Sequence, residues 1–420
     1  MFTSNKIEVN NFIITNIRFL INVTEQNTLL RGSQLAQLPV IENAFLVVQN
    51  NIIKDYGTMR QLPEHYSSLP SINASNASIL PTWCDSHTHL VFAATREEEF
   101  VDKLKGKTYA QIAANGGGIL NSAKKINEAT EDFLYEASLN RLQQLIKLGT
   151  GAIEIKSGYG LSVQSELKML RVIQRIKQNI PIPVKATFLG AHAYPEQYKT
   201  NHEAYIKLIT EEMLPNISKE NLADYVDVFC EEGFFSAQEM IHIVEAAFKY
   251  NLKPKLHVNQ LNSIGGIHAG IKLNAVSLDH LETLTEEEIN ILAASNTIAT
   301  LLPTAAFFLR MQFQPARRLI DTGCAVALAS DFNPGSSPSG NMHFVAALSC
   351  IQMKMLPEEA INAATINGAH AMELASQVGS ITKGKKANFI FTKNIPSLAY
   401  IPYVFGENII DKVMINGNFF

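Results

Sequence analysis

Two histidines one residue apart, His87 and His89, follow an apolar run and have a spacing that suits metal binding. Side chains alternate between the two faces of a strand, so both imidazoles point the same way, with Asp85 on the same face. Zinc takes imidazole nitrogen at roughly 2.0–2.1 Å, and two such neighbours can reach one ion. A histidine pair at a strand end without a metal is equally ordinary, so the pair must be judged with the rest of the chain.

Residues that commonly bind metals recur at the ends of other predicted strands, namely His192, Glu231, His257, His280 and Asp331. In a barrel of parallel strands the carboxyl ends meet on one face, so these side chains would converge there. A single histidine of this kind is more often structural, but the joint placement favours a site. Three imidazoles and one carboxylate leave a position open for water. The ligands we assign are His87, His89, His257 and Asp331.

A metal in such a site lowers the pKa of water towards neutrality and polarises a carbonyl group, so hydrolysis or hydrolytic deamination is expected. His280 would then lie beside the ligands, where a neutral imidazole can orient the water or carry a proton. Lys156 follows the second predicted strand and not the fourth, so a carboxylated lysine bridging two metals is not expected. Glu231 leaves a two-metal site open, although an exposed acid is the more ordinary interpretation.

Eight apolar runs predict the strands that position these residues: 77–80, 151–155, 184–189, 225–229, 255–258, 275–278, 298–302 and 325–329. Helices are expected between most of them, at 131–148, 163–177, 237–250 and 286–294. Eight β/α units in roughly 270 residues suit a (β/α)8 barrel. A doubly wound sheet is the structural alternative, but no glycine-rich dinucleotide fingerprint follows any strand.

The two ends of the chain differ from this middle part and resemble each other. Short strand-like pieces occur at 12–14, 17–21, 45–48 and 52–53, and again at 389–391 and 412–415 after a helix expected over 358–374. A barrel inserted between the halves of one small β domain explains both ends. We therefore predict an α/β fold: a TIM-like barrel over 77–375, with a composite β-sandwich domain built from 1–76 and 376–420.

Composition narrows the class of protein further. The 420 residues are 46% apolar and 18% charged, and a net charge of -4 gives no footprint for nucleic acid or an anionic membrane surface. The four cysteines are scattered, which argues against a disulfide framework. The first ten residues lack a signal-peptide pattern, and no run of about 18 apolar residues occurs. We expect a soluble cytoplasmic enzyme and, from base rates, a homodimer.

The ligand pattern and the flanking β pieces resemble the amidohydrolase superfamily. The closer resemblance is to its imidazolonepropionase family, whose members open the imidazolone ring in histidine degradation. The segments that carry it are 84–90, 116–119, 154–161, 187–192, 226–231 and 330–336, which span nearly the whole predicted barrel. The pair His87–His89 alone is weak evidence, whereas the Lys-Ser-Gly-Tyr-Gly-Leu and Asp-Phe-Asn-Pro-Gly stretches are specific.

This resemblance implies a substrate, 4-imidazolone-5-propanoate, a product, N-formimino-L-glutamate, and one Zn²⁺ or Fe³⁺ per subunit. Arg96 stands where the family has its carboxylate-binding arginine, and a guanidinium suits a carboxylate bidentately. The other positions that match substrate or product contacts are Tyr159, His192, Asn333, Gly335 and Ser336. Tyr109 is a weaker candidate, for which a packed helix tyrosine is the simpler interpretation.

Gln260 falls where family members carry Glu or Gln, and an amide can hydrogen-bond the ring but cannot take up a proton in this pH range. We therefore place proton transfer on Asp331, assisted by His280, with either His192 or the metal polarising the carbonyl. Two other functions stay open: a related deaminase or cyclic amidase, and a scaffold that lost the reaction. Arg96, Tyr159 and the 333–336 loop argue against the first, and the complete ligand set argues against the second.

Overall fold

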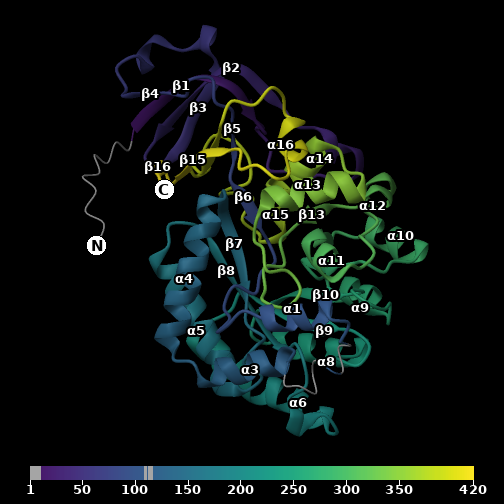
Figure 1. Cartoon of the computed structure of the whole chain (residues 1–420). Helices are drawn as coiled ribbons and strands as arrows, with labels where there is room; N and C mark the ends of the chain where they lie inside the picture. Colours follow the sequence, from purple (N-terminus) through teal and green to yellow (C-terminus); the bar gives the residue numbers. More distant parts are fainter. Residues whose placement is uncertain (1–10, 108–110, 112–116) are drawn as a thin grey trace.

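The computed structural model describes residues 11–107, 111 and 117–420, and Figure 1 shows two bodies, a helix-covered barrel and a β-sheet that caps one end. The barrel strands run parallel in chain order. They are β6 (Trp83–Asp85), β7 (Thr150–Lys156), β8 (Val184–Ala191), β9 (Tyr225–Cys230), β10 (Lys253–Val258), β11 (Ser277–His280), β12 (Ile298–Leu301) and β13 (Val326–Leu328). The predicted (β/α)8 barrel is confirmed.

The barrel closes just beyond its first and last strands. Thr88 forms a parallel bridge with Phe332, and the Asp331 N–H donates to the His87 carbonyl at 3.0 Å. The barrel therefore closes between the segment that carries His87 and His89 and the residues around Asp331. The limits of the strands alone would not show this.

One strand assignment was wrong. The second half of the run 77–80, expected as the first barrel strand, lies in β5 (Ile79–Pro81), which pairs with β1 and β14 in the other sheet. The first barrel strand is the shorter β6, which follows directly. Both pieces are apolar and buried, so periodicity alone could not tell which sheet each one joins.

Helices surround the barrel, and several of them begin at a side-chain cap. The hydroxyls of Thr130, Ser162, Ser236 and Thr285 each accept a backbone N–H at the start of α4, α5, α8 and α10. The helices are α1 (Glu97–Leu104), α3 (Ile119–Glu128), α4 (Glu131–Lys147), α5 (Val163–Asn179), α6 (His202–Leu208), α7 (Leu214–Glu220), α8 (Ala237–Phe248), α9 (Gly266–Lys272), α10 (Glu286–Ala294), α11 (Pro303–Leu309), α12 (Ala316–Thr322), α13 (Met342–Met353), α14 (Pro357–Ala364), α15 (Ile366–Ala371) and α16 (Tyr400–Tyr403).

The single helix expected over 358–374 was also wrong, because the chain breaks at Thr365 into α14 and α15. The Thr365 hydroxyl donates to the Ile361 carbonyl at 2.6 Å and accepts from the Asn22 amide at 3.1 Å. A threonine whose hydroxyl donates to a carbonyl of the preceding turn bends a helix. Here Asn22, which directly follows β1, holds the hydroxyl in place.

The small domain is built from both ends of the chain, as predicted. Its strands are β1 (Asn11–Ile21), β2 (Val40–Gln49), β3 (Ile52–Thr58), β4 (Ser71–Asn73), β5, β14 (Phe389–Thr392), β15 (Ile410–Ile415) and β16 (Asn418–Phe419). They are hydrogen-bonded in one continuous sheet in which β5 lies between β1 and β14. The N-terminal strands (purple) and C-terminal strands (yellow) therefore lie side by side in Figure 1.

The helix pair α14–α15 joins the two bodies beneath the first barrel strand. A Cβ atom at Gly368 would lie 2.3 Å from the carbonyl oxygen of Cys84, so α15 reaches β6 only because this residue lacks a side chain. No described helix is long and apolar enough to cross a membrane.

Replacement of Gly368 by alanine is expected to lower the free energy of unfolding by about 1–3 kcal/mol, because the clash is with backbone that cannot rotate away. Thermal or urea unfolding would measure it. Gly406→Ala is the matched control, since nothing lies within 4 Å of its added Cβ. Equal effects of the two substitutions would show that α15 does not depend on this close approach.

Candidate metal centre and active site

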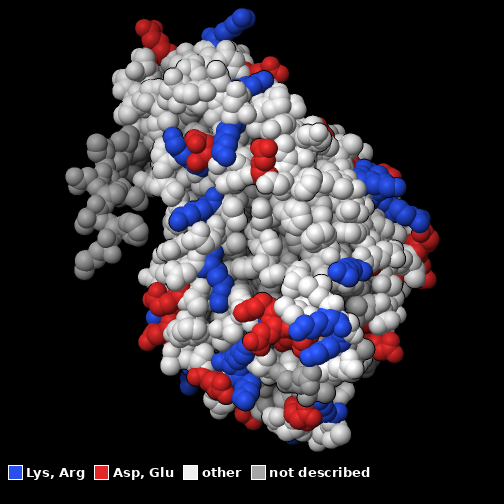
Figure 2. Space-filling view, in the orientation of Figure 1, with Lys and Arg blue, Asp and Glu red and all other residues white. Residues whose placement is uncertain are grey.

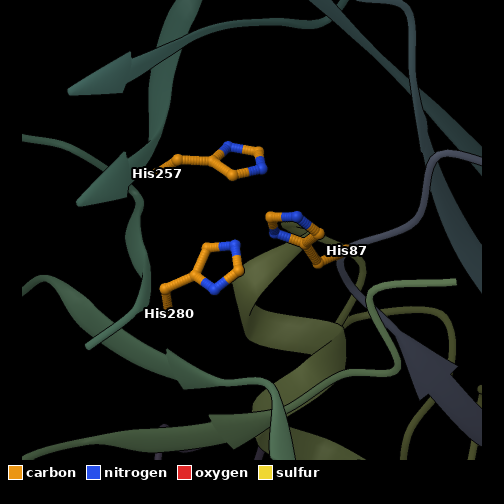
Figure 3. Close-up of side chains that lie close together, drawn as sticks. All are labelled: His87, His257 and His280. Carbon is orange, nitrogen blue, oxygen red and sulfur yellow. The ribbon is translucent and has the colours of Figure 1, made fainter. Parts of the chain in front are cut away.

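The carboxyl ends of the barrel strands bring the predicted site residues together. His87 and His89 follow β6, His257 lies in β10, and His280 ends β11. The ring centre of His87 is 5.3 Å from that of His89, 4.4 Å from that of His257 and 5.7 Å from that of His280. Figure 3 shows the rings of His87, His257 and His280 lying close together, with His257 and His280 on strands and His87 just after one.

Two overlapping groups of side chains could each hold a metal ion, with His87 shared by both. One is His87, His257 and His280, and the other is His87, His89 and Asp331. The Nε2 atoms of His87 and His89 both lie 3.5 Å from Asp331 Oδ1. Ligands at roughly 2.1 Å in a tetrahedral centre are roughly 3.4 Å apart, so this spacing fits a single ion. The four predicted ligands are divided between the two groups, and His280 belongs to the group that contains His257.

The histidine tautomers are set by carboxylates behind the rings. His87 Nδ1 lies 2.6 Å from Asp279 Oδ2, and His257 Nδ1 lies 2.7 Å from Asp227 Oδ2. Each Nδ1 therefore carries the hydrogen, which leaves the Nε2 lone pair for a ligand. His87 Nε2 is buried and has no hydrogen-bond partner among the described residues. A buried acceptor without a partner is costly, and a metal ion would satisfy it.

A layer of buried charges lies beneath these aspartates, and the sequence analysis did not assign it a role. Glu154 and Lys156 in β7, and Lys255 in β10, are all fully buried. Lys156 lies 2.8 Å from Glu154 Oε1 and 2.9 Å from Asp227 Oδ2. A signal was available: charged residues at alternate positions of otherwise apolar strands are rarely buried unless they are paired.

Burial keeps the three predicted histidine ligands neutral. It lowers the pKa of His87, His89 and His257 well below the usual value, and the neighbouring histidines add to the effect. A metal binds only the neutral imidazole, so the site is prepared for a cation at ordinary pH.

His280 and Asp331 respond differently to the same burial. Burial alone would lower the pKa of His280, but the carboxylates of Glu282, Asp331 and Asp279 together outweigh this effect and raise the pKa. Glu282 contributes most of the three, with its Oε1 3.3 Å from Nδ1. Burial raises the pKa of Asp331 to about 6.

The backbone φ is 88° at His280 and 51° at Asp331, a region that non-glycine residues seldom adopt and that is common at functional sites.

The loop that carries Asp331 is fixed by its own side chains. Asp85, predicted to stand behind the histidine pair, accepts hydrogen bonds from the N–H and hydroxyl of Ser330. The Asn333 amide donates to the Asp331 carbonyl at 2.6 Å and accepts from the N–H groups of Gly335 and Ser336. Asn333 therefore shapes the loop, whatever else it binds.

A cavity of about 490 Å³ opens over the histidines and includes every predicted substrate contact. Its lining residues are His89, Arg96, Lys103, Ile119, Tyr159, His192, Phe229, Phe234, His257, Gln260, Leu261, His280, Leu309, Asp331, Asn333, Gly335 and Ser336. Lys103, which places a second cation in this wall, was missed by the sequence analysis. Tyr109 lies outside the described residues.

Arg96 is positioned at the start of α1 by contacts on two sides. Its Nη2 lies 2.5 Å from Glu99 Oε2, and Glu99 also accepts the Gly118 N–H at 3.0 Å. A Cβ atom at Gly335 would lie 2.3 Å from Arg96 Nη1, so the guanidinium packs where only glycine leaves room. Arg96 Nε is buried without a partner among the described residues, which suits a donor that waits for a ligand.

His192 stacks on His89, with 5.4 Å between ring centres. Its Nδ1 lies 2.9 Å from the carbonyl oxygen of Gly158, and burial lowers its pKa to about 4. A carbonyl can only accept, so Nδ1 carries the hydrogen and Nε2 of the neutral ring is an acceptor. His192 therefore cannot polarise a carbonyl by donating from Nε2 at neutral pH.

Glu231 is neither an exposed acid nor close enough to join the candidate metal groups. It is buried, and its Oε2 accepts the backbone N–H groups of Leu261 and Asn262 at 2.8 and 3.2 Å. Glu231 thus holds the loop that places Gln260 in the cavity wall.

Comparison with known proteins agrees with this geometry. Residues 78–420 match the amidohydrolase family. The chain is 56% identical to the imidazolonepropionase of Flavobacterium johnsoniae over 96% of its length and 98% of that protein. It is 44% identical to the Clostridium tetani imidazolonepropionase over 92% and 93%.

Solved structures share the fold at low sequence identity. Guanine deaminase from C. acetobutylicum superposes with a TM-score of 0.70 and 20% identity, covering 98% of this chain and all of that one. Guanine deaminase from E. coli gives a TM-score of 0.72 and 14% identity, with 98% of each chain covered.

Metal affinity of this site should fall at acid pH, because Asp331 is protonated as the pH drops through about 6 while His87, His89 and His257 stay neutral. We expect Zn²⁺ affinity about tenfold weaker at pH 5 than at pH 7.5, as one pH unit below a pKa implies. Competition with a chelating dye would measure it.

The Asp331→Asn variant should bind Zn²⁺ more weakly and lose most of this pH dependence. Asp321→Asn, at an exposed aspartate of α12, is the control and should leave both unchanged. An Asp331→Asn variant with the full pH dependence would show that another group titrates.

Proposed function

The chain belongs to the amidohydrolase family and, within it, to the imidazolonepropionases, and from this premise we propose that it hydrolyses 4-imidazolone-5-propanoate to N-formimino-L-glutamate. The observation that best supports the proposal is that one cavity of about 490 Å³ has Arg96 in its wall and the histidine cluster at its base. A cationic group and a hydrolytic centre therefore face the same small space, as a propanoate-bearing cyclic amide requires.

Substrate binding is assigned to Arg96 and its neighbours. The guanidinium offers its Nε–H, which has no partner among the described residues, to the propanoate, and Lys103 adds positive charge to the same wall. Tyr159 is buried beside His89 and His192, so its ring packs against the imidazolone. Asn333, Gly335 and Ser336 form the wall that closes over the substrate.

The residues fit a metal ion, and we propose that His87, His89, His257 and Asp331 hold it. A bound Zn²⁺ or Fe³⁺ would lower the pKa of water and polarise the attacked carbonyl group. Both ions suit a set of three nitrogens and one oxygen, and supply in the cell decides between them.

The reaction adds a water oxygen to the ring carbonyl carbon and breaks the carbon–nitrogen bond, so the departing nitrogen must gain a proton. Asp331 is an acceptor at neutral pH and takes the proton from the water. His280, held by Glu282, assists Asp331 in passing it to the nitrogen. Gln260 can hydrogen-bond the ring but cannot carry the proton.

His192 has a role other than carbonyl polarisation. Because His192 donates its Nδ1–H to the carbonyl oxygen of Gly158, its Nε2 is free to accept a hydrogen bond from the N–H of the substrate ring. His192 thus orients the heterocycle, and polarisation is left to the metal site.

We further propose a cytoplasmic homodimer in which residues 1–76 and 376–420 support a barrel over 77–375. The four cysteines are unpaired, which suits a reducing compartment. Figure 2 shows acidic and basic side chains interspersed on the visible face, as suits a protein that binds a small molecule and not a polyanion.

Freshly made 4-imidazolone-5-propanoate mixed with metal-analysed protein tests the function directly. Loss of the imidazolone absorbance with formation of formiminoglutamate is expected, and His257→Ala should abolish both. His242→Ala, an exposed histidine on α8, is the control that should stay active. A metal-loaded protein that leaves this compound untouched would refute the substrate assignment.

Arg96→Gln should lower kcat/KM about 10- to 100-fold, mainly through KM, because it removes a charge-assisted bond to the propanoate. Lys105→Gln at the end of α1 is the matched control and should change neither constant. A ring analogue without the propanoate chain should react equally with both variants. An unchanged KM for the full substrate would place its carboxylate elsewhere.

A further inference from the structure

One fully buried cation, Lys156 in β7, contacts the carboxylates behind two of the proposed metal ligands. Its Nζ lies 2.9 Å from Asp227 Oδ2 and 3.8 Å from Asp279 Oδ2. The same two oxygens face the histidines, at 2.7 Å from His257 Nδ1 and 2.6 Å from His87 Nδ1. A single ammonium group therefore connects the supports of imidazoles that come from different strands.

We propose that Lys156 is a positioning residue for the metal site: it holds Asp227 and Asp279 in the orientation in which they accept the Nδ1 hydrogens of His257 and His87. The two Nε2 lone pairs then stay aimed at the ion. Groups behind a ligand that fix its tautomer and ring angle typically change metal affinity 10- to 100-fold.

The rest of the buried layer does not duplicate this contact. Lys255 reaches Glu154 Oε2 at 3.5 Å and donates to the Ser277 hydroxyl at 2.8 Å. Among the described residues, Lys156 is the only lysine or arginine that forms an ion pair with Asp227 or Asp279. Glu154 also accepts from the Thr187 hydroxyl, so Glu154 retains partners when Lys156 is removed.

A purely electrostatic role would give the opposite result. A cation beside a metal site repels the metal, so its removal alone would strengthen metal binding. Loss of positioning would weaken it. The direction of the change in affinity therefore separates the two roles.

A second substitution distinguishes the proposed positioning role of Lys156 from a role in stability alone. Lys156→Met keeps the side-chain length but leaves Glu154 without its closest cation, at 2.8 Å, which destabilises the fold. The double variant Lys156→Met/Glu154→Gln removes both charges of that pair, so it should recover much of the lost stability. It would not restore the contacts to Asp227 and Asp279.

The experiment measures Zn²⁺ affinity by competition with a chelating dye, and apo-protein stability by thermal unfolding, for the full chain and these variants. We expect both variants to bind Zn²⁺ 10- to 100-fold more weakly than the unmodified protein, with the double variant more stable than the single one. Lys385→Met is the matched control, because Lys385 is also buried and, within the described part of the chain, donates its hydrogen bonds to Val378 and Ser380. It should alter stability without altering affinity.

The proposal would be overturned if the double variant bound Zn²⁺ as tightly as the unmodified protein or more tightly. Lys156 would then only neutralise the charge of the buried carboxylates. The inference rests on the metal site of the proposed function, but the assay needs no substrate. A wrong substrate assignment would leave the result unchanged, whereas an unmodified protein that binds no Zn²⁺ would refute the metal site itself.

Discussion

An imidazole has two nitrogens, and the site depends on which of them carries the hydrogen. Carboxylates accept hydrogen bonds from the Nδ1–H groups of His87 and His257, so the lone pair of each Nε2 faces the space above the barrel. Carboxylates buried this deeply require compensation. Lys156 in β7 pairs with Asp227 and Asp279, and Lys255 in β10 pairs with Glu154. These three carboxylates against two ammonium groups leave one negative charge beneath a site suited to a cation. The buried charges inside the barrel thus determine which nitrogen of His87 and His257 faces the cavity.

The substrate side of the cavity is organised separately from the metal side. Arg96 is held by Glu99 on its own helix and by the close approach of Gly335, which lies on the loop that also carries Asp331. Asn333 fixes the turns of that loop, and Asp85 binds it to the segment that carries His87 and His89. One short loop therefore sets the distance between the Arg96 guanidinium and the histidine cluster, and in the proposed function this distance selects the chain length of the substrate.

Much of this arrangement was predictable from local sequence. The alternation around His87 and His89, and the placement of His257, His280 and Asp331 at strand ends, identified the cluster because parallel strands end on one face. The partners beneath it were not identified, since the contacts of Lys156 with Asp227 and Asp279 join strands far apart in sequence. The run 77–80 was assigned to the wrong sheet for a similar reason: the strand in which it ends pairs with residues near both ends of the chain. Glu231 was misjudged because its partners are backbone groups of a distant loop.

Diffraction from crystals grown with Zn²⁺, recorded at the zinc absorption edge, tests the central claim most directly. We expect one anomalous peak, from a Zn²⁺ ion bonded to Nε2 of His87, His89 and His257 and to a carboxylate oxygen of Asp331. His280 should lie beside the ion without a bond to it. Asp279 and Asp227 should stay on the Nδ1 atoms of His87 and His257. A metal on either Nδ1 atom, or a second metal at Lys156 or Glu231, would contradict the account.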